Sequence, residues 1–429
     1  MKSKPMARAS VVVAFALLAM LIPIQHLFAQ GGGSIFTRYG LGDLQYYENS
    51  AAVGMGGAGL STLPVTVIDA ENPANWSQIN LTRFSLGGDY QGISVADNSS
   101  SSHFGYTGFN GAAFALPLSP PSGFVVSIGV APYSVVRYDV LTTPPTSAEF
   151  GSSTLEYVGQ GGINFGWFGA SYNLSSSLHV GARVKYYFGT IQNSITQTFD
   201  SSVFQGSTDL RNTQFRGVAV TFGAVYSGLS KILNLGEKNS LNLGAVVTTS
   251  SNLSVNENQV ITATTAGQVT SDTINTSLPR VKIPLSYGFG ASYGTSRLLL
   301  AADALFQNWS GTSYPGILLP AENNSNRFGA GIELLPVHEP NLSLWRRSIY
   351  RLGAYEHTTY YQINGQSINE TAVTGGWGFT IMGETHLDLG LEYVVRGTTD
   401  YSLEREKLLR FTFTLSGADL WFIKPPPED

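Results

Sequence analysis

The stretch Leu-Asp-Leu-Gly-Leu-Glu-Tyr-Val-Val-Arg, residues Leu387–Arg396, alternates between apolar side chains and side chains that are small or charged. Residues Leu178–Phe188 repeat this alternation. A period of two predicts a β-strand with one apolar and one wet face. A soluble sandwich would bury the apolar face against a second sheet. A membrane barrel would turn that face to lipid and keep the charges in its lumen.

The first 29 residues have the features of a secretory signal peptide. Lys2, Lys4 and Arg8 form a basic start, the apolar stretch Val11–Ile24 follows, and Ala29 precedes a plausible cleavage site. The apolar stretch is short for a membrane-spanning helix. We therefore expect residues 1–29 to be removed on export.

The composition favours the membrane barrel. Charged residues make up 12% of the chain, about half of the usual value for soluble proteins, and 48 glycines accompany 12% aromatic residues. Without the signal peptide the formal charge moves from −5 to −8, which argues against nucleic acid as a partner. Cysteine is absent, so the chain has no thiolate metal site and no disulfide.

The mature chain divides into two predicted regions. Residues 30–80 are rich in small side chains without sustained alternation, and we interpret them as an N-terminal hatch. Residues 81–429 contain fifteen alternating segments, many longer than the roughly 9–11 residues that cross a bilayer. Because bacterial barrels favour even strand numbers and Val260–Val269 is the weakest segment, we predict an all-β, antiparallel transmembrane barrel of about fourteen strands.

The connections between these segments should alternate in length, as in outer-membrane barrels. Tight turns are expected at Asn173–Ser177 and Gly383–Thr385. Long polar loops are expected at Ile93–His103, Thr142–Ser153, Gln192–Arg211 and Asn308–Asn326.

Charged side chains within the predicted strands share the face opposite the apolar one. At mid-bilayer a charge facing lipid costs about 2–4 kcal/mol, so we assign these side chains to the lumen. An ordinary polar face of a soluble sheet is the alternative. The predicted lumenal charges are Arg83, Asp89, Arg183, Lys185, Arg327, Glu333, Asp388, Glu392, Arg396 and Arg410.

No motif in the sequence predicts catalysis. Gly54–Gly59 matches G-x-G-x-x-G but lacks the preceding strand and following helix of a dinucleotide site. The histidines are scattered without metal-ligand spacing, and no Ser-His pair of an outer-membrane phospholipase is recognisable. We expect no enzyme, no cofactor and no metal site.

Several short motifs resemble known outer-membrane proteins. Ser34–Leu44, Val130–Ser134 and Leu420–Lys424 are similar to segments of Bacteroidota outer-membrane proteins. Gly54, Gly56 and Gly57, followed by Asn72, Pro73 and Ala74, resemble the N-terminal hatch of the FadL family of hydrophobic-compound transporters. That resemblance implies a fourteen-stranded barrel, a lumen closed by the N-terminal segment, and passage of hydrophobic molecules. PorV-like components of type IX secretion share the barrel type.

Two prolines carry specific hypotheses. Pro132 has no N–H to donate, so Ala131 and Pro132 could mark a kink in the third strand where solute leaves sideways, or Pro132 could lie at the rim where the strand ends. Pro73 starts a turn that the Asn72 side chain can cap, either as a plain link or as a latch.

These expectations define one function and one alternative. The chain is expected in the Gram-negative outer membrane, surrounded by lipid, as a passive conduit for hydrophobic small molecules such as long-chain fatty acids. The alternative is a PorV-like secretion component or a structural, binding barrel, with secretion-machinery proteins as partners.

Overall fold

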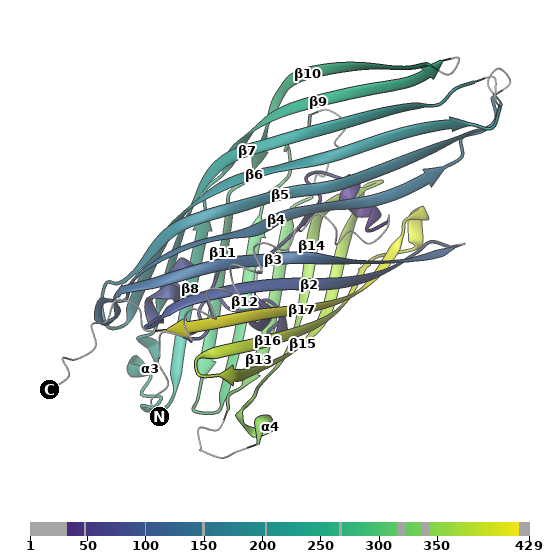
Figure 1. Cartoon of the computed structure of the whole chain (residues 1–429). Helices are drawn as coiled ribbons and strands as arrows, with labels where there is room; N and C mark the ends of the chain where they lie inside the picture. The colour runs from purple at the N-terminus through teal and green to yellow at the C-terminus, as the bar shows by residue number, and fades with distance from the viewer. Residues whose placement is uncertain are drawn as a thin grey trace, which may run out of the picture. The chain divides into compact units, whose positions relative to one another are not determined.

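The computed structural model describes residues 32–46, 49–98, 100–147, 151–201, 204–265, 268–315, 319, 323–336 and 343–419. The predicted signal peptide and the motif Leu420–Lys424 lie outside these residues. The described chain forms a closed antiparallel β-barrel of fourteen strands (Figure 1). No helix in the described part is long and apolar enough to cross a membrane.

The barrel wall follows the order of the chain. Its elements are β2 (Thr82–Ala96), β3 (Ser101–Ser119), β4 (Phe124–Thr142), β5 (Ser153–Asn173), β6 (Leu178–Phe199), β7 (Ser207–Tyr226), β8 (Ser240–Thr248), β9 (Ser251–Thr265), β10 (Gln268–Ile283), β11 (Ser286–Gly294), β12 (Leu298–Gln307), β13 (Ser325–Leu334), β14 (Ile349–Ile363), β15 (Gln366–Met382), β16 (Thr385–Gly397) and β17 (Arg405–Asp419). β17 pairs with β2 from Asp419↔Thr82 to Arg405↔Ala96, which closes the cylinder.

Two of the fourteen wall strands are interrupted. β8 and β9 both pair with β7, so together they form one wall strand with a break at residues 249–250. β10 pairs with β9 and β11 with β8, so these two form the next wall strand, interrupted at Pro284. The predicted total of fourteen is confirmed, but treating Val260–Val269 as a separate weak segment is wrong, because residues 260–265 belong to β9 and Gln268 and Val269 to β10.

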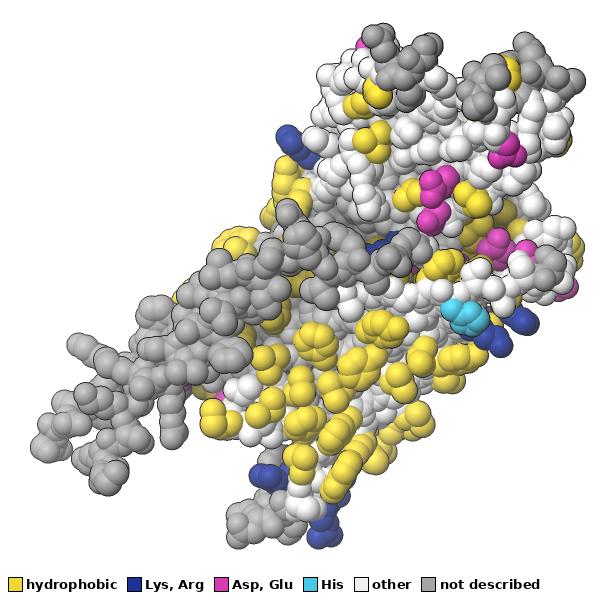
Figure 2. Space-filling view, turned by 45° about the vertical axis from the view of Figure 1, so that its right-hand side comes forward, with side chains coloured by type: hydrophobic (Ala, Val, Ile, Leu, Met, Phe, Trp, Pro, Cys, Tyr) yellow, Lys and Arg dark blue, Asp and Glu magenta, His cyan; other side chains and the backbone are white. Residues whose placement is uncertain are grey.

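The outer face of the lower barrel is apolar. Within the stretch that alternates at Leu387–Arg396, Leu391 is 50% and Tyr393 42% exposed, whereas Asp388 is 3% and Glu392 0% exposed. This is the inverse of a soluble protein, and it fits a barrel whose outer side chains lie in lipid. Figure 2 shows the result on one face, where hydrophobic side chains gather in a band with Lys and Arg at its lower edge.

The wall is taller on one side than on the other. β5, β6 and β7 have 21, 22 and 20 residues, whereas β12 and β13 have 10 each. We call the part of the tall side beyond the lipid-facing residues the crest. The crest comprises residues 153–162, 190–199, 207–214, 251–265 and 268–280.

Two expected long loops are therefore mostly strand. β6 runs to Phe199 and β7 begins at Ser207, so the loop predicted at Gln192–Arg211 shrinks to a short connection. The loop predicted at Ile93–His103 is likewise a hairpin of β2 and β3. Many outer positions of the crest are polar, such as Gln192, Asn212 and Asn258, so the crest resembles a loop in composition, while backbone pairing keeps it extended.

The N-terminal segment, residues 32–79, lies against the inner faces of the wall. It contains η2 (Ile35–Arg38), β1 (Asp43–Leu44), α2 (Ser50–Gly54) and η3 (Pro73–Gln78). α2 packs against β14–β17, and η3 packs against β4–β7. Leu41, Leu60 and Trp76 are almost completely buried there. The other short helices, η4 (Pro120–Ser122), α3 (Leu229–Ile232), α4 (Leu344–Arg347) and η5 (Asp400–Ser402), lie in connections.

Candidate functional site

The predicted glycine motif forms the turn after α2. The side chain of Asn49 caps this helix by accepting a hydrogen bond of 2.7 Å from the Ala52 N–H. Gly56 and Gly57 follow with φ values of 67° and 79°, the left-handed region that glycine adopts freely. A Cβ on Gly56 would lie 2.5 Å from the Ala354 carbonyl oxygen. The turn can therefore approach the wall only with glycine at this position.

The wall contributes glycines of its own at this contact. A Cβ on Gly331 would lie 2.5 Å from the Met55 carbonyl oxygen, and one on Gly353 2.3 Å from the Gly56 nitrogen. A Cβ on Gly54 would in turn lie 2.8 Å from the Gly376 Cα. These inward wall glycines were missed from sequence, although glycine at inward positions of predicted strands is the signal that could have found them.

Asn72, Pro73 and Ala74 begin η3. The Asn72 carboxamide accepts a hydrogen bond from the Ala74 N–H at 3.0 Å and donates one to the Leu60 carbonyl oxygen at 2.6 Å. Gly223 of β7 leaves room for this side chain, because a Cβ there would lie 1.9 Å from Asn72 Oδ1. The motif thus joins two parts of the N-terminal segment and seats them on the wall.

Asp69 belongs to the same part of the segment. Burial raises the pKa of its carboxyl above the usual value. Hydrogen bonds from the Glu71 N–H, at 2.7 Å, and from the Asn75 side chain lower this pKa and so oppose the effect of burial.

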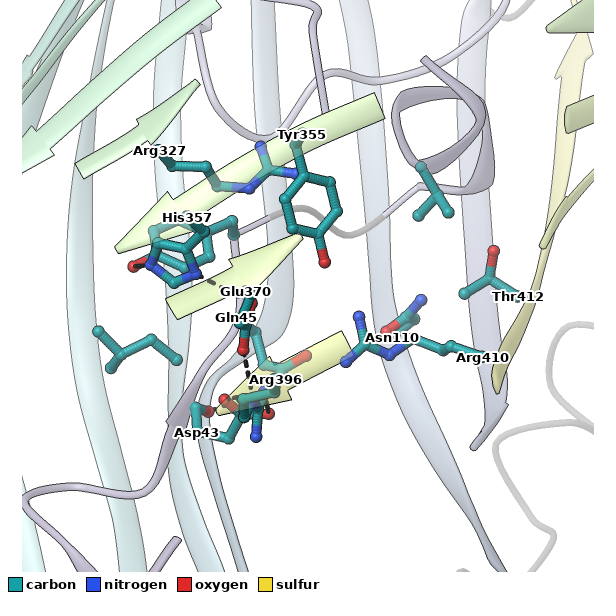
Figure 3. Close-up of a pocket in the computed structure, with 13 residues that line it drawn as sticks. Asp43, Gln45, Asn110, Arg327, Tyr355, His357, Glu370, Arg396, Arg410 and Thr412 are labelled. Atoms are coloured by element: carbon teal, nitrogen blue, oxygen red, sulfur yellow. Dashed lines mark hydrogen bonds and ion pairs between the residues drawn. The ribbon is translucent and has the colours of Figure 1, made fainter. Parts of the chain in front are cut away.

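A charged network on β13–β17 holds the beginning of the segment. Arg396, 2% exposed, donates two hydrogen bonds to the Asp43 carboxylate at 2.9 and 3.0 Å. The same guanidinium pairs with Glu370 and, at 3.4 Å, with Glu406. Figure 3 shows Arg396 between Asp43 and Glu370. Removing one member of such a cluster leaves a buried charge uncompensated.

Other predicted lumenal charges pair along the same wall. Arg351 contacts Glu333 at 2.5 Å and Asp388 at 2.6 Å, and Arg410 contacts Glu392 at 3.0 Å. The structure thus brings together Glu333, Asp388, Glu392, Arg396 and Arg410 from the predicted set. Sequence reasoning missed Arg351, Glu370 and Glu406, which the same parity argument would have found, and Asp43, which lies outside any predicted strand.

The remaining predicted charges also have contacts outside this network. Arg327 donates to the Gly56 carbonyl oxygen at 3.0 Å, and Arg83 donates to the Thr66 carbonyl oxygen at 3.3 Å. Arg183 and Lys185 lie over aromatic rings of β5, with Lys185 Nζ 4.6 Å from the Phe165 ring centre.

Two further acidic side chains lie on β2 and β12. Asp89 lies on β2, where its carboxylate would overlap a Cβ at Gly108 of β3. Asp303, which was not predicted, accepts hydrogen bonds from the Gly59 and Leu60 N–H groups at 2.6 and 2.8 Å.

The space left beside the charged network is small. Asp43, Tyr46, Arg327, His357, Arg396 and Arg410 are among the residues around a cavity of about 30 Å³ (Figure 3). That volume holds about one or two water molecules. Among the described residues no group of three His, Asp or Glu has the arrangement of a metal site.

The opposite inner face, on β4–β7, β9 and β10, carries a cluster of buried apolar side chains, beside which Arg183 and Lys185 also lie. Phe165 and Trp167 lie with ring centres 5.8 Å apart, and Tyr133 and Tyr187 lie 5.0 Å apart edge to face. The buried side chains of this apolar wall include Ala131, Val136, Ile163, Phe165, Trp167, Tyr187, Ile191, Phe215, Val255 and Val281.

The ladder between β3 and β4 breaks beside this apolar wall. Its last pair is Ala112↔Val130, whereas β4 stays paired with β5 as far as Thr142. Ala131 and Pro132 follow this last pair directly, and the β4–β5 register shifts between Pro132 and Ser134. Pro132 therefore lies in the interior of β4 and not at the strand's end.

The N-terminal segment takes the place of β3 along the freed edge of β4. β1 pairs with it at Leu44↔Ser134 and Asp43↔Val135. The Thr37 hydroxyl donates to the Arg137 carbonyl oxygen at 3.0 Å and accepts from the Arg137 N–H at 3.1 Å. The gap in the wall ladder is thus bridged by residues that are not part of the wall.

Comparison with solved structures gives the same fold. CymD, a monoaromatic hydrocarbon channel, aligns over 90% of this chain and 100% of its own with a TM-score of 0.58 and 13% identity. A Pseudomonas aeruginosa FadL homologue aligns over 88% and 99%, with a TM-score of 0.57 and 14% identity. The Ralstonia pickettii toluene transporter TbuX aligns over 86% and 98%, with a TM-score of 0.55 and 15% identity. No curated protein matches the sequence.

A closed barrel with an apolar outer face, charges inside and an N-terminal segment against its inner wall is an outer-membrane β-barrel protein of the FadL-like fold. Within that class the chain belongs to the BamG family, whose model matches residues 6–425. The Bacteroidota branch of the resemblance stays a prediction.

Proposed function

We propose that this barrel is a passive conduit for hydrophobic small molecules, such as long-chain fatty acids or monoaromatic hydrocarbons. The observation that carries the proposal is the break between β3 and β4 at Val130, because it lies next to the apolar inner wall. Each CH₂ of a hydrophobic solute that is kept out of water lowers the free energy by about 0.8 kcal/mol, so such a solute needs an apolar path and an exit into lipid. The proposal includes no catalytic step and no cofactor.

In this proposal the N-terminal segment, residues 30–80, is the plug. β1 bridges the freed edge of β4, and Arg396 holds Asp43 of the same strand by two hydrogen bonds. The solute passes when β1 leaves β4, and it moves sideways at Ala131 and Pro132 into the bilayer.

A reversible lock between β1 and β4 tests the proposal. The natural chain has no cysteine, so Leu44→Cys with Ser134→Cys joins two residues that face each other in the ladder. We expect the oxidised protein in lipid vesicles to lose most of its uptake of toluene or a fatty acid, and to regain it on reduction.

The matched control joins strands that are already paired. Ala115→Cys with Ser127→Cys links β3 to β4 below the break, where the ladder is intact. Uptake should not change in this control. Full uptake through the oxidised variant that joins β1 to β4 would contradict a conduit gated by β1.

A second candidate is a binding barrel for secretion-machinery proteins, as in the PorV-like alternative. The crest favours it, because β5, β6 and β7 have about twice the roughly 9–11 residues that a bilayer requires. No solute flux in either redox state, together with a photocrosslink from Ser194 of the crest to a secretion protein, would favour this second function.

A further inference from the structure

Three cations lie on the outer face of the tall wall. They are Arg216 on β7 and Arg280 and Lys282 on β10, and all three are exposed. Val218 and Phe222 continue the outer face of β7 below Arg216 and are 54% and 51% exposed. At the break between β10 and β11 the exposed Leu285 comes three residues after Lys282. The cations therefore lie at the upper border of the lipid-facing band.

Strand register brings these cations close together. Arg216 pairs with Ser254 of β9, and Lys282 pairs with Asn252 of the same strand. Arg280 lies in the bulge between Leu278 and Val281, next to Ser254. Neighbouring strands are about 4.8 Å apart, so two strand spacings separate β7 from β10. In the described part of the chain no carboxylate forms an ion pair with any of the three.

Two rows of uncharged polar side chains lie directly above the cations. In the first row Gln214 faces Asn256, which faces Ser277, and the Ser277 hydroxyl donates to Asn256 Oδ1 at 3.1 Å. The rows lie about 7 and 13 Å beyond Arg216, because side chains on one face of a strand repeat every two residues.

The second row consists of carboxamides alone. Asn212 faces Asn258, which faces Asn275, and Asn258 Nδ2 donates to Asn275 Oδ1 at 2.8 Å. Together with Glu257 and Thr276, the two rows line a groove of about 260 Å³, close to the lower end of small-molecule sites at roughly 300 Å³.

We propose that this face binds the phosphorylated sugar headgroup of an outer-leaflet glycolipid. The three cations would contact its phosphates, and the carboxamides in the groove would exchange hydrogen bonds with its sugar hydroxyls. Along the membrane normal the side chains follow the same order as the parts of such a lipid. Apolar side chains lie level with the acyl chains, the cations with the phosphates, and the carboxamides with the sugars. This site is independent of the conduit, since it lies on the outside of the barrel.

The test measures glycolipid binding to the full-length protein in detergent. Arg216→Gln, Arg280→Gln and Lys282→Gln are combined, and binding of a phosphorylated lipopolysaccharide is followed by native mass spectrometry and titration. We expect binding roughly tenfold to a hundredfold weaker than in the natural protein. Asn256→Ala with Asn258→Ala should weaken binding of the same glycolipid but leave binding of a sugar-free phospholipid unchanged.

The control removes the same charge from the opposite rim. Lys238→Gln, Arg297→Gln and Arg346→Gln alter exposed cations in other connections and should leave binding unchanged. Heat-modified migration on gels confirms that each variant is a folded barrel. Equal losses in both triple variants, equal binding of dephosphorylated glycolipid, or equally tight binding of inorganic phosphate alone would each overturn the proposal.

Discussion

At the scale of single residues, Gly56 is a position where both the backbone angle φ and the available space require glycine. Its φ of 67° and the 2.5 Å from a Cβ to the Ala354 carbonyl oxygen predict that Gly56→Ala destabilises the protein by about 1–3 kcal/mol. Urea unfolding in lipid vesicles, followed by tryptophan fluorescence, measures this loss.

Gly59 supplies the matched control for that measurement. A Cβ there meets nothing within 4 Å, so Gly59→Ala should change the free energy of unfolding little. Equal destabilisation by both substitutions would show that the close approach of the turn to β14 is not what requires glycine.

The charged residues show which lumen-facing side chains can be predicted from alternation along a strand. Alternation within the strands was sufficient to predict Asp388, Glu392 and Arg396, because a charge on the lipid face would be costly. It could not predict that Asp43 completes the Arg396 cluster, since the two lie 353 residues apart and Asp43 belongs to no alternating segment.

At the scale of elements, β4 is the strand whose hydrogen bonding is least regular. Pro132→Val restores an N–H beside the break, and one backbone hydrogen bond contributes about 1 kcal/mol to stability. If the solute leaves at this break, uptake into lipid vesicles should become about fivefold slower, with assembly unaffected.

Pro279 offers a comparison within the same barrel. It also lies at a register shift, between Leu278 and Val281 of β10, but far from the β3–β4 gap. Pro279→Val should leave uptake unchanged. Unaltered uptake in the Pro132→Val variant would remove the sideways exit at this position.

Strand boundaries were predicted well where lipid requires alternating apolar side chains, and poorly in the crest. The alternation at Leu178–Phe188 lies wholly within β6, but β6 continues for eleven residues to Phe199. In the continuation, Gln192 faces Asn212 and Thr196 faces Thr208, all polar. Backbone pairing with β5 and β7 keeps that part extended, and a single sequence carries little sign of such pairing.

At the scale of the whole molecule, the proposed role of the N-terminal segment is to close the lumen of the barrel. Deletion of residues 30–80 removes Asp43 from Arg396, the Gly59 and Leu60 N–H groups from Asp303, and β1 from the freed edge of β4. We expect the intact protein to be silent in planar bilayers and the deletion variant to conduct ions in discrete steps. A silent deletion variant that migrates as a folded barrel would argue against a plug.

The division of the mature chain stays a prediction from composition and alternation. A glycine-rich stretch without alternation, followed by alternating segments, is the reason for expecting residues 30–80 to form a hatch. The contacts between the two, such as Thr37 with Arg137 or Asn72 with Leu60, depend on three-dimensional proximity that no spacing in the chain reveals.

The seam between β17 and β2 also sets an order of events during biogenesis. Asp43 is synthesised early, but Arg396 and Glu406, its neighbours in the ion-pair cluster, emerge more than 350 residues later. Asp43 can therefore join this cluster only after the last two strands have been made, and the pairing of β17 with β2 then closes the barrel around it. Such long-range contacts slow folding. A nascent chain cut short before β16 keeps the contacts of its N-terminal segment with β4 but lacks the ion pair that holds Asp43.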